Sequence, residues 1–265
     1  MLKLYVKQMV VDTPLSRIGH RLRWISQTPQ RMRHPELWDL YLEDGRTKLA
    51  LETLIAPDDN CVDVGAHIGS MLAEIRRLAP CGSHVGFEPT PAKARLLRRK
   101  FGDVRIVEAA TAEEPGTALF YDDLDRPGFS GLQRPVDDST IRSYEVRLVT
   151  LDKELADRDR IDFLKIDVEG AELSTLRGAE EVLSRHKPAI LFECGPSSQL
   201  QRFGYERADL FDFLAERGYD VYSMVDFVFG RDSMTRESFE KAGTYPYRGF
   251  NYLALPAGTK VERLL

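Results

Sequence analysis

From about residue 60 onward, short apolar runs alternate with segments of helical periodicity, and this alternation constrains the fold more than any other feature. Short apolar runs between turn residues are typical of buried strands, whereas apolar residues three or four positions apart are typical of helices. When strands and helices alternate over roughly 200 residues, they form a mainly parallel sheet covered by helices on both faces. The sequence therefore predicts an α/β fold.

The expected elements can be placed by residue range. We expect strands at residues 61–64, 85–87, 104–110, 161–166, 189–192, 220–225 and 250–255, with looser apolar runs at 119–121 and 146–149. We expect helices at residues 69–78, 91–101 and 171–186, and another around Leu210 that ends at Gly218. Pro91 suits the first turn of its helix, and Gly102 suits the position just after the helix.

The first part of the chain differs from this pattern. Residues 1–33 form a basic arm in which five arginines interleave with apolar side chains, and a helical segment follows from Pro35 to Ile55, with a break at Gly45 left open. A solvated extension lying on the domain is favoured for the arm over contact with an acidic substrate or a membrane surface. We therefore divide the chain into an N-terminal arm with a helical extension (1–56) and a main domain (57–265).

The charge balance and hydropathy narrow the partners and the location. With 37 Lys and Arg against 42 Asp and Glu, the formal net charge is −5, which does not favour a nucleic-acid partner. No apolar run approaches the roughly 18 residues of a membrane span, and Lys3, Lys7 and Asp12 interrupt any signal-peptide core. The sequence predicts a soluble cytoplasmic protein without an integral membrane segment, and it leaves open whether the chain forms oligomers.

The strand that ends near Val64 is followed by a turn with two glycines, Gly65 and Gly69, before a helix. In open α/β sheets, ligands bind beyond the carboxyl ends of the strands. Glycine lets a ligand approach the backbone closely, and the helix N-terminus presents N–H groups to it. The spacing is G-x-x-x-G instead of G-x-G-x-x-G, which favours a ligand with an amino-acid end over a dinucleotide. The alternative is an ordinary tight turn.

Acidic residues follow three further strands. Glu88 ends the second strand, 25 residues after Asp63, where a carboxylate can bind both hydroxyls of an adenosine ribose. Asp167 ends the fourth strand in an otherwise apolar segment, close to Glu169, and Glu193 follows the fifth strand. Together with the glycine turn, these acids indicate a nucleoside-containing ligand with reactive carboxylates beside it.

At this point the residues resemble a known family, the FkbM-type methyltransferases. The resemblance lies in residues 62–69, 86–89, 150–152, 161–172 and 251–256, of which the block around Lys165 is the most specific. It implies a Rossmann-like class I methyltransferase fold with a mainly parallel seven-stranded sheet, S-adenosylmethionine as methyl donor, and O-methylation of a sugar, glycan or natural-product acceptor. His67 departs from the family, which more often has Asn at this position.

The resemblance also implies roles for particular residues. The residues it assigns to cofactor binding are Asp63, Gly65, Ala66, His67 and Gly69 around the methionine portion, Glu88 and Pro89 at the ribose, Ala110 beside the adenine, and Asp167 near the sulfonium. A hydroxyl acceptor must lose its proton during transfer, so a base is needed in the crevice. Asp167, Glu169 and His67 are the expected catalytic residues, with Glu193 as a further candidate.

Three alternatives stay open at this stage. Asp167, Glu169 and Glu193 carry oxygen ligands that suit Mg²⁺, so a magnesium ion could lower the pKa of the acceptor, although the leading expectation includes no metal. The chain could instead be an NAD-dependent Rossmann oxidoreductase. It could also be a catalytically inactive methyltransferase-like domain that binds a partner through its basic arm.

Overall fold

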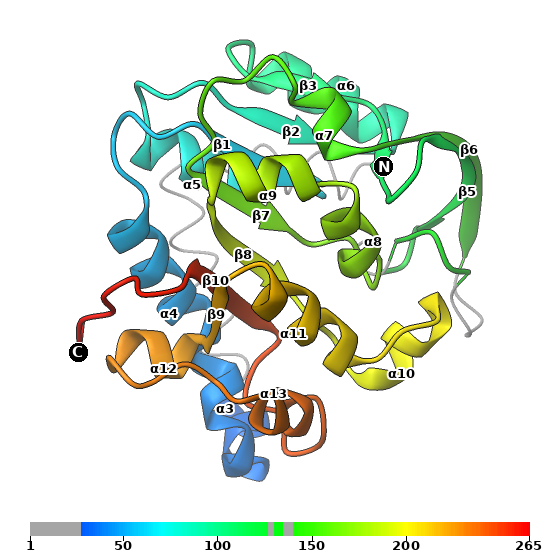
Figure 1. Ribbon diagram of the computed structural model, residues 1–265. Helices are drawn as coiled ribbons and strands as arrows, with labels where there is room; N and C mark the ends of the chain where they lie inside the picture. The colour runs from blue at the N-terminus through cyan, green and yellow to red at the C-terminus, as the bar shows by residue number, and fades with distance from the viewer. Residues whose placement is uncertain (1–27, 127–129, 135–139) are drawn as a thin grey trace.

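The structure, a computed structural model, describes residues 28–126, 130–134 and 140–265 and contains a seven-stranded sheet (Figure 1). Its strand order is β3-β2-β1-β7-β8-β10-β9. The strands are β1 (Cys61–Val64), β2 (Val85–Phe87), β3 (Arg105–Val107), β7 (Phe163–Ile166), β8 (Ala189–Glu193), β9 (Tyr219–Ser223) and β10 (Asn251–Pro256). Only β10 runs antiparallel to its neighbours, β8 and β9. This arrangement confirms the expected Rossmann-like, mainly parallel fold.

Alternation of side chains along the central strands builds two apolar layers, one on each face of the sheet. Val62, Leu164 and Ile190 pack against α8 (Glu172–Arg177), α9 (Glu180–His186), α11 (Arg207–Glu216) and α13 (Arg236–Ala242). Cys61 and Phe163 instead pack against α4 (Trp38–Leu54), α5 (Ser70–Leu78) and α12 (Met224–Val228). Helix α6 (Pro91–Lys100) packs beside α5 and β3 in a third cluster. Helices therefore cover both faces.

A second, three-stranded sheet was not expected from the sequence. It consists of β4 (Ala110–Thr111), β5 (Gly116–Asp123) and β6 (Ile141–Val149) in the order β4-β6-β5. The strand expected at 104–110 is therefore split, because Val107 still pairs in the large sheet whereas Ala110 pairs with Leu148 in the small one. The chain changes sheets at residues 108–109, beside the carboxyl ends of β1 and β2.

Two other expected elements also differ from the prediction. The helix expected at 171–186 divides into α8 and α9, because the Gly178 carbonyl accepts a hydrogen bond from Asp152 N (2.9 Å) and its Cα lies against the Ala112 backbone. The strand expected at 220–225 stops at Ser223, whose hydroxyl caps α12 by accepting from Asp226 N at 3.1 Å. The other elements within the described ranges are short: α3 (Thr28–Arg33), η1 (Pro35–Leu37), α7 (Leu151–Glu154), α10 (Ser197–Leu200) and η3 (Gln201–Phe203).

The helical extension packs against the main sheet. Helix α4 runs without interruption through Gly45 and contacts α12. The buried carboxylate of Glu43 accepts hydrogen bonds from the backbone N–H groups of Phe250 (2.7 Å) and Asn251 (2.9 Å) at the start of β10. Most of the basic arm, residues 1–27, lies outside the described residues. Among the helices of the described ranges, none has the length and apolar character needed to cross a membrane.

Candidate active site

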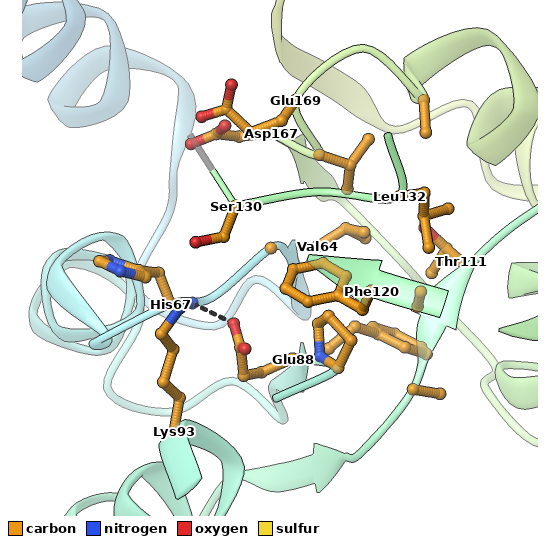
Figure 2. Close-up of a pocket in the computed structure, with 17 residues that line it drawn as sticks. Val64, His67, Glu88, Lys93, Thr111, Phe120, Ser130, Leu132, Asp167 and Glu169 are labelled. Carbon is orange, nitrogen blue, oxygen red and sulfur yellow. Dashed lines mark hydrogen bonds between the residues drawn. The ribbon is translucent and has the colours of Figure 1, made fainter. Parts of the chain in front are cut away.

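A cavity lies at the carboxyl ends of β1, β2 and β7, between these strand ends and the small sheet (Figure 2). It encloses about 700 Å³ including its open mouth, which is within the range of cofactor and small-molecule sites. Its walls are mostly apolar, with charged groups at separate places. The lining residues are Val64, Gly65, His67, Phe87, Glu88, Pro89, Lys93, Ala109, Ala110, Thr111, Phe120, Ser130, Leu132, Asp167, Val168, Glu169 and Ala171.

Two backbone N–H groups at the cavity hold the carboxyl group of Glu88 in place. Its Oε2 accepts a hydrogen bond from His67 N (2.9 Å) and its Oε1 accepts one from Thr90 N (2.9 Å), as Figure 2 shows for the first. Burial raises the pKa of the Glu88 carboxyl, and the positive charge of Lys93 opposes this rise. A carboxylate offers about four lone-pair sites. Two therefore remain for a vicinal diol such as that of a ribose.

The glycine turn between β1 and α5 is built by close packing of chain against chain. Gly65 has a φ of 79°, and a Cβ atom there would lie 1.8 Å from the Asp167 carbonyl oxygen. Gly69 has a φ of 84°, and a Cβ atom there would lie 2.4 Å from the Phe101 ring. Both positions need glycine. Gly65 sets the distance between β1 and the loop after β7, while Gly69 lets α5 approach α6.

Three carboxyl groups gather where β7 and β8 end. The side chain of Asp167 is 36% exposed and hydrogen-bonds with Glu193. Burial would raise the pKa of Asp167, but the charge of Lys165 and the hydrogen bond with Glu193 lower it. Burial and the charge of Asp167 raise the pKa of Glu193 well above its usual range. The two carboxyl groups are therefore coupled, and their contact favours the proton on Glu193 over Asp167.

Glu169 and the loop around it form the next part of the wall. Burial and the neighbouring charges of Asp167 and Glu172 raise the pKa of Glu169 to about 8. Its Oε2 accepts a hydrogen bond from Gln199 Nε2 at 3.1 Å. The backbone of Glu169 is in the left-handed region (φ 57°), a conformation that Glu172 supports by accepting from Val168 N (3.2 Å) and Gly170 N (3.1 Å). Such a conformation persists in a non-glycine residue where the surroundings enforce it.

His67 enters the cavity from the glycine turn with a φ of 50°. Burial, together with the positive charge of Lys93, lowers the pKa of His67 to about 4. The imidazole is therefore neutral at pH 7, and its buried Nε2 has no hydrogen-bond partner among the residues that the structure describes. A neutral ring with a free nitrogen can contact a ligand, but its low pKa makes it a weaker base than an imidazole with an ordinary pKa.

The small sheet closes the other side of the cavity. Phe120, Ser130 and Leu132 line this side. The hydroxyl of Ser130 donates to Asp122 Oδ1 (3.2 Å), which also accepts from the buried Lys93 Nζ at 3.1 Å. Lys93 lies on the inward face of α6, a position that helical periodicity marks as core, so the sequence pattern alone gives no signal for a charged cavity residue.

The structure brings together most, but not all, of the expected site residues. Gly65, His67, Glu88, Pro89, Ala110, Asp167 and Glu169 line the cavity. Asp63, Ala66 and Gly69 do not line it: Asp63 is fully buried against Lys165, and Ala66 packs in the cluster between α5 and α6. Their expected cofactor contacts stay predictions.

The carboxyl groups are not arranged as a metal site. Across residues 28–126, 130–134 and 140–265, no group of three His, Cys, Asp or Glu side chains is placed to hold a metal ion. Asp167 instead hydrogen-bonds with Glu193, and Glu169 accepts from Gln199. The magnesium alternative thus finds no support in this arrangement.

A known protein family and several known proteins are similar to this chain. The model of the methyltransferase FkbM domain matches residues 63–221. Methyltransferase 1 of Beauveria bassiana is 30% identical over 152 residues, covering 47% of this chain and 60% of that protein. AMB antimetabolite synthetase AmbE of Pseudomonas aeruginosa is 27% identical over 259 residues, covering 80% of this chain.

The chain spans only 11% of the length of AmbE and 60% of that of Methyltransferase 1. Among solved structures, the methyltransferase FkbM from Methylobacillus flagellatus is similar with a TM-score of 0.47 and 18% identity, covering 76% of this chain and 44% of that one.

Proposed function

Since the chain belongs to the FkbM methyltransferase family, we propose that it is an S-adenosylmethionine-dependent O-methyltransferase that acts on a sugar, glycan or natural-product hydroxyl. One observation carries the proposal. A single cavity holds a backbone-anchored carboxylate, Glu88, at one place and an ionised carboxylate, Asp167, at another, with apolar walls between them. This matches a ligand with a ribose diol, a flat base and a reactive charged end.

The residues of the cavity suit each part of this cofactor. Glu88 would accept hydrogen bonds from the ribose hydroxyls through its two free lone pairs. The apolar side chains of Phe87, Pro89 and Leu132, together with Ala110, would surround the adenine. Gly65 and His67 border the end of the cavity where the methionine portion would lie. When bound, S-adenosylmethionine supplies an already activated methyl group, so the protein contributes mainly alignment and removal of the acceptor proton.

Asp167 is the proposed base. It is ionised because Lys165 and the Glu193 hydrogen bond lower its pKa, and its side chain is partly open to the cavity. The other three candidates are less suited at neutral pH. The raised pKa of Glu193 and the pKa of Glu169, about 8, favour the protonated forms of these two groups, while the low pKa of His67 weakens it as a base. Asp167 would take the proton of the acceptor hydroxyl as the methyl group is transferred.

A hydroxyl-rich acceptor fits the polar wall beyond Asp167. Glu169 and Gln199 present a carboxyl and an amide there, groups that hydrogen-bond to sugar hydroxyls. On the same face of the sheet, Glu193 pairs in register with Asn251, whose amide donates to Glu43 of α4 at 3.0 Å. Helix α4 therefore borders the acceptor side in this proposal. One relative is named as an antimetabolite synthetase, which supports a small-molecule acceptor.

The proposal is tested by following the methyl group. The protein is incubated with S-adenosylmethionine carrying a deuterated methyl group and with fractionated pools of sugars, glycans and small metabolites, and products are identified by mass spectrometry. We expect one class of hydroxyl compound to gain a CD₃ group, and Asp167→Asn to suppress the gain. Binding of the donor without transfer to any pool would favour the inactive binding domain, and transfer to nitrogen or carbon would refute O-methylation.

A further inference from the structure

The ammonium group of Lys165 lies where the glycine turn and the loop after β7 meet. Its Nζ is 3.1 Å from Asp167 Oδ2, 3.3 Å from Asp63 Oδ1 and 3.1 Å from the carbonyl oxygen of Gly65. The carbonyl oxygen of Val64 lies 3.4 Å away. Lys165 is only 6% exposed. One buried cation thus contacts the carboxyl ends of β1 and β7, two of the three strands that border the cavity.

The sheet register explains why these groups meet. Asp63 on β1 pairs directly with Lys165 on β7, so the two side chains lie on the same face of the sheet. Lys165 then reaches along that face towards the carboxyl ends of the strands, where Gly65 and Asp167 lie. The turn and the loop are also in backbone contact, since Asp167 N donates to Val64 O at 3.1 Å. The lysine adds a charged link to this backbone contact.

The pKa values of the carboxyl groups around Lys165 depend on its positive charge. Asp63 is fully buried, and burial raises its pKa while Lys165 opposes the rise. Burial would lower the pKa of Lys165, but the charges of Asp167 and Asp63 outweigh that effect and raise it. The other titratable groups that act on Asp167 are His67 and the carboxyl groups of Glu193, Glu169 and Glu172. Of these groups, Lys165 alone brings a permanent positive charge.

We propose that Lys165 is a positioning residue of the methyl-transfer site, which fixes the Gly65 turn relative to Asp167 and keeps Asp167 in its carboxylate form. This inference rests on the proposed function. Lys165 touches neither cofactor nor acceptor in this account, because two carboxylates and two carbonyl groups surround its ammonium. It acts through Asp167 and through the backbone that borders the methionine end of the cavity.

The test compares Lys165→Met, Asp63→Asn and the double variant Asp63→Asn/Lys165→Met with the wild type. Methionine keeps the apolar stem and removes the charge. The dissociation constant of S-adenosylmethionine is measured by calorimetry from pH 5.5 to 7.5, and the melting temperature is recorded alongside. Dividing each variant's constant by the wild-type constant at the same pH cancels the titration of the ligand itself.

We expect Lys165→Met to bind at least tenfold more weakly at pH 7.5, with a ratio that changes several-fold over the pH range as Asp167 takes up a proton. The double variant should regain melting temperature relative to Lys165→Met, because no buried Asp63 charge is left unpaired, yet keep the pH-dependent ratio. Asp63→Asn retains the lysine, so its ratio should be flat across the pH range.

Two results would overturn the proposed role of Lys165 without affecting the proposed function. One is wild-type affinity in a folded Lys165→Met variant. The other is a weakened but pH-independent affinity that Asp63→Asn restores, which would show that Lys165 only neutralises Asp63. If the wild type itself binds no S-adenosylmethionine, the proposed function fails, and the inference fails with it.

Discussion

At the scale of single residues, the ionisation state of each carboxyl group follows from its neighbours more than from its position in the chain. Asp167 and Glu193 both end buried strands, yet the charge of Lys165 lowers the pKa of Asp167, whereas burial and the charge of Asp167 raise the pKa of Glu193. The sequence identified both acids as candidates but could not separate them. The difference between their pKa values depends on contacts between β7 and β8, which become visible only once the strands are paired.

Glu88 offers the sharpest test of the cofactor site. Replacing it with Ala should weaken S-adenosylmethionine binding by about 1.5–3 kcal/mol, the usual value for hydrogen bonds to a charged group. Because Glu88 also accepts from the backbone of His67 and Thr90, Glu88→Gln should lose less affinity than Glu88→Ala. Calorimetry measures both losses. Glu108→Ala, at a carboxylate paired with Arg98 outside the cavity, is the control, and equal affinities in all three proteins would refute the ribose contact.

Asp167→Asn should bind the cofactor but transfer the methyl group about 10²–10⁴-fold more slowly, the usual contribution of a general base. Single-turnover rates with the acceptor found by CD₃ labelling measure this loss. EDTA should leave the wild-type rate unchanged, since the carboxyl groups are not arranged to hold a metal ion in the described part of the chain. Near-normal turnover by Asp167→Asn would transfer the role of base to His67.

At the scale of elements, the large sheet was predictable because each of its strands is an apolar run between clear turn signals. The small sheet was not, because β5 and β6 bury fewer than half of their side chains and alternate weakly. The division of the helix expected at 171–186 was also hidden. It depends on contacts of Gly178 with Ala112 and Asp152, which are distant in sequence. Local periodicity carries no information about such contacts.

The turn between β1 and α5 was predicted correctly in position, but its glycines also have a packing role that the sequence did not indicate. The sequence suggested that glycine makes room for a ligand, and Gly65 does line the cavity, but Gly65 also makes room for the Asp167 carbonyl and Gly69 for Phe101. The positions of the turn and of the loop after β7 therefore depend on each other. A change at Gly65 must move Asp167 as well as the cavity wall.

Gly65→Ala is expected to destabilise the fold by about 1–3 kcal/mol, from the positive φ and the displaced carbonyl, and to weaken cofactor binding at least tenfold. Chemical denaturation and calorimetry measure the two effects. Gly45→Ala is the matched control, since Gly45 lies inside helix α4 and a Cβ atom added there would have no atom within 4 Å. That variant should be more stable by about 0.5–1 kcal/mol. Wild-type affinity in Gly65→Ala would contradict the close coupling of turn and loop.

At the scale of the whole molecule, the site concentrates buried acids whose pKa is raised in the folded state. Burial raises the pKa of Glu172 to about 7, although three backbone N–H groups oppose the rise, and burial likewise raises those of Glu43 and Glu88. The folded chain therefore binds more protons than the unfolded chain between the ordinary and the raised pKa values. Its stability should fall as the pH rises through that window.

Glu172→Gln tests this dependence on pH. Glutamine copies the protonated carboxyl group, since its oxygen can accept from Val168 and Gly170 and its amide can donate to Tyr205. Between about pH 4.5 and 7, the wild type should lose up to about 3 kcal/mol more unfolding free energy than the variant. Urea denaturation at several pH values gives the two slopes. The exposed Glu216→Gln should keep the wild-type slope, and an unchanged slope in Glu172→Gln would contradict the buried, protonated state.

The measurement that tests the account most directly is a calorimetric titration of the wild-type chain with S-adenosylmethionine and, separately, with NAD. The cavity with Glu88 at the ribose position and Asp167 at the reactive end predicts saturable binding of one S-adenosylmethionine per chain and no binding of NAD. An absence of heat with S-adenosylmethionine, or saturable binding of NAD that Glu88→Ala abolishes, would contradict the assignment of this cavity to methyl transfer.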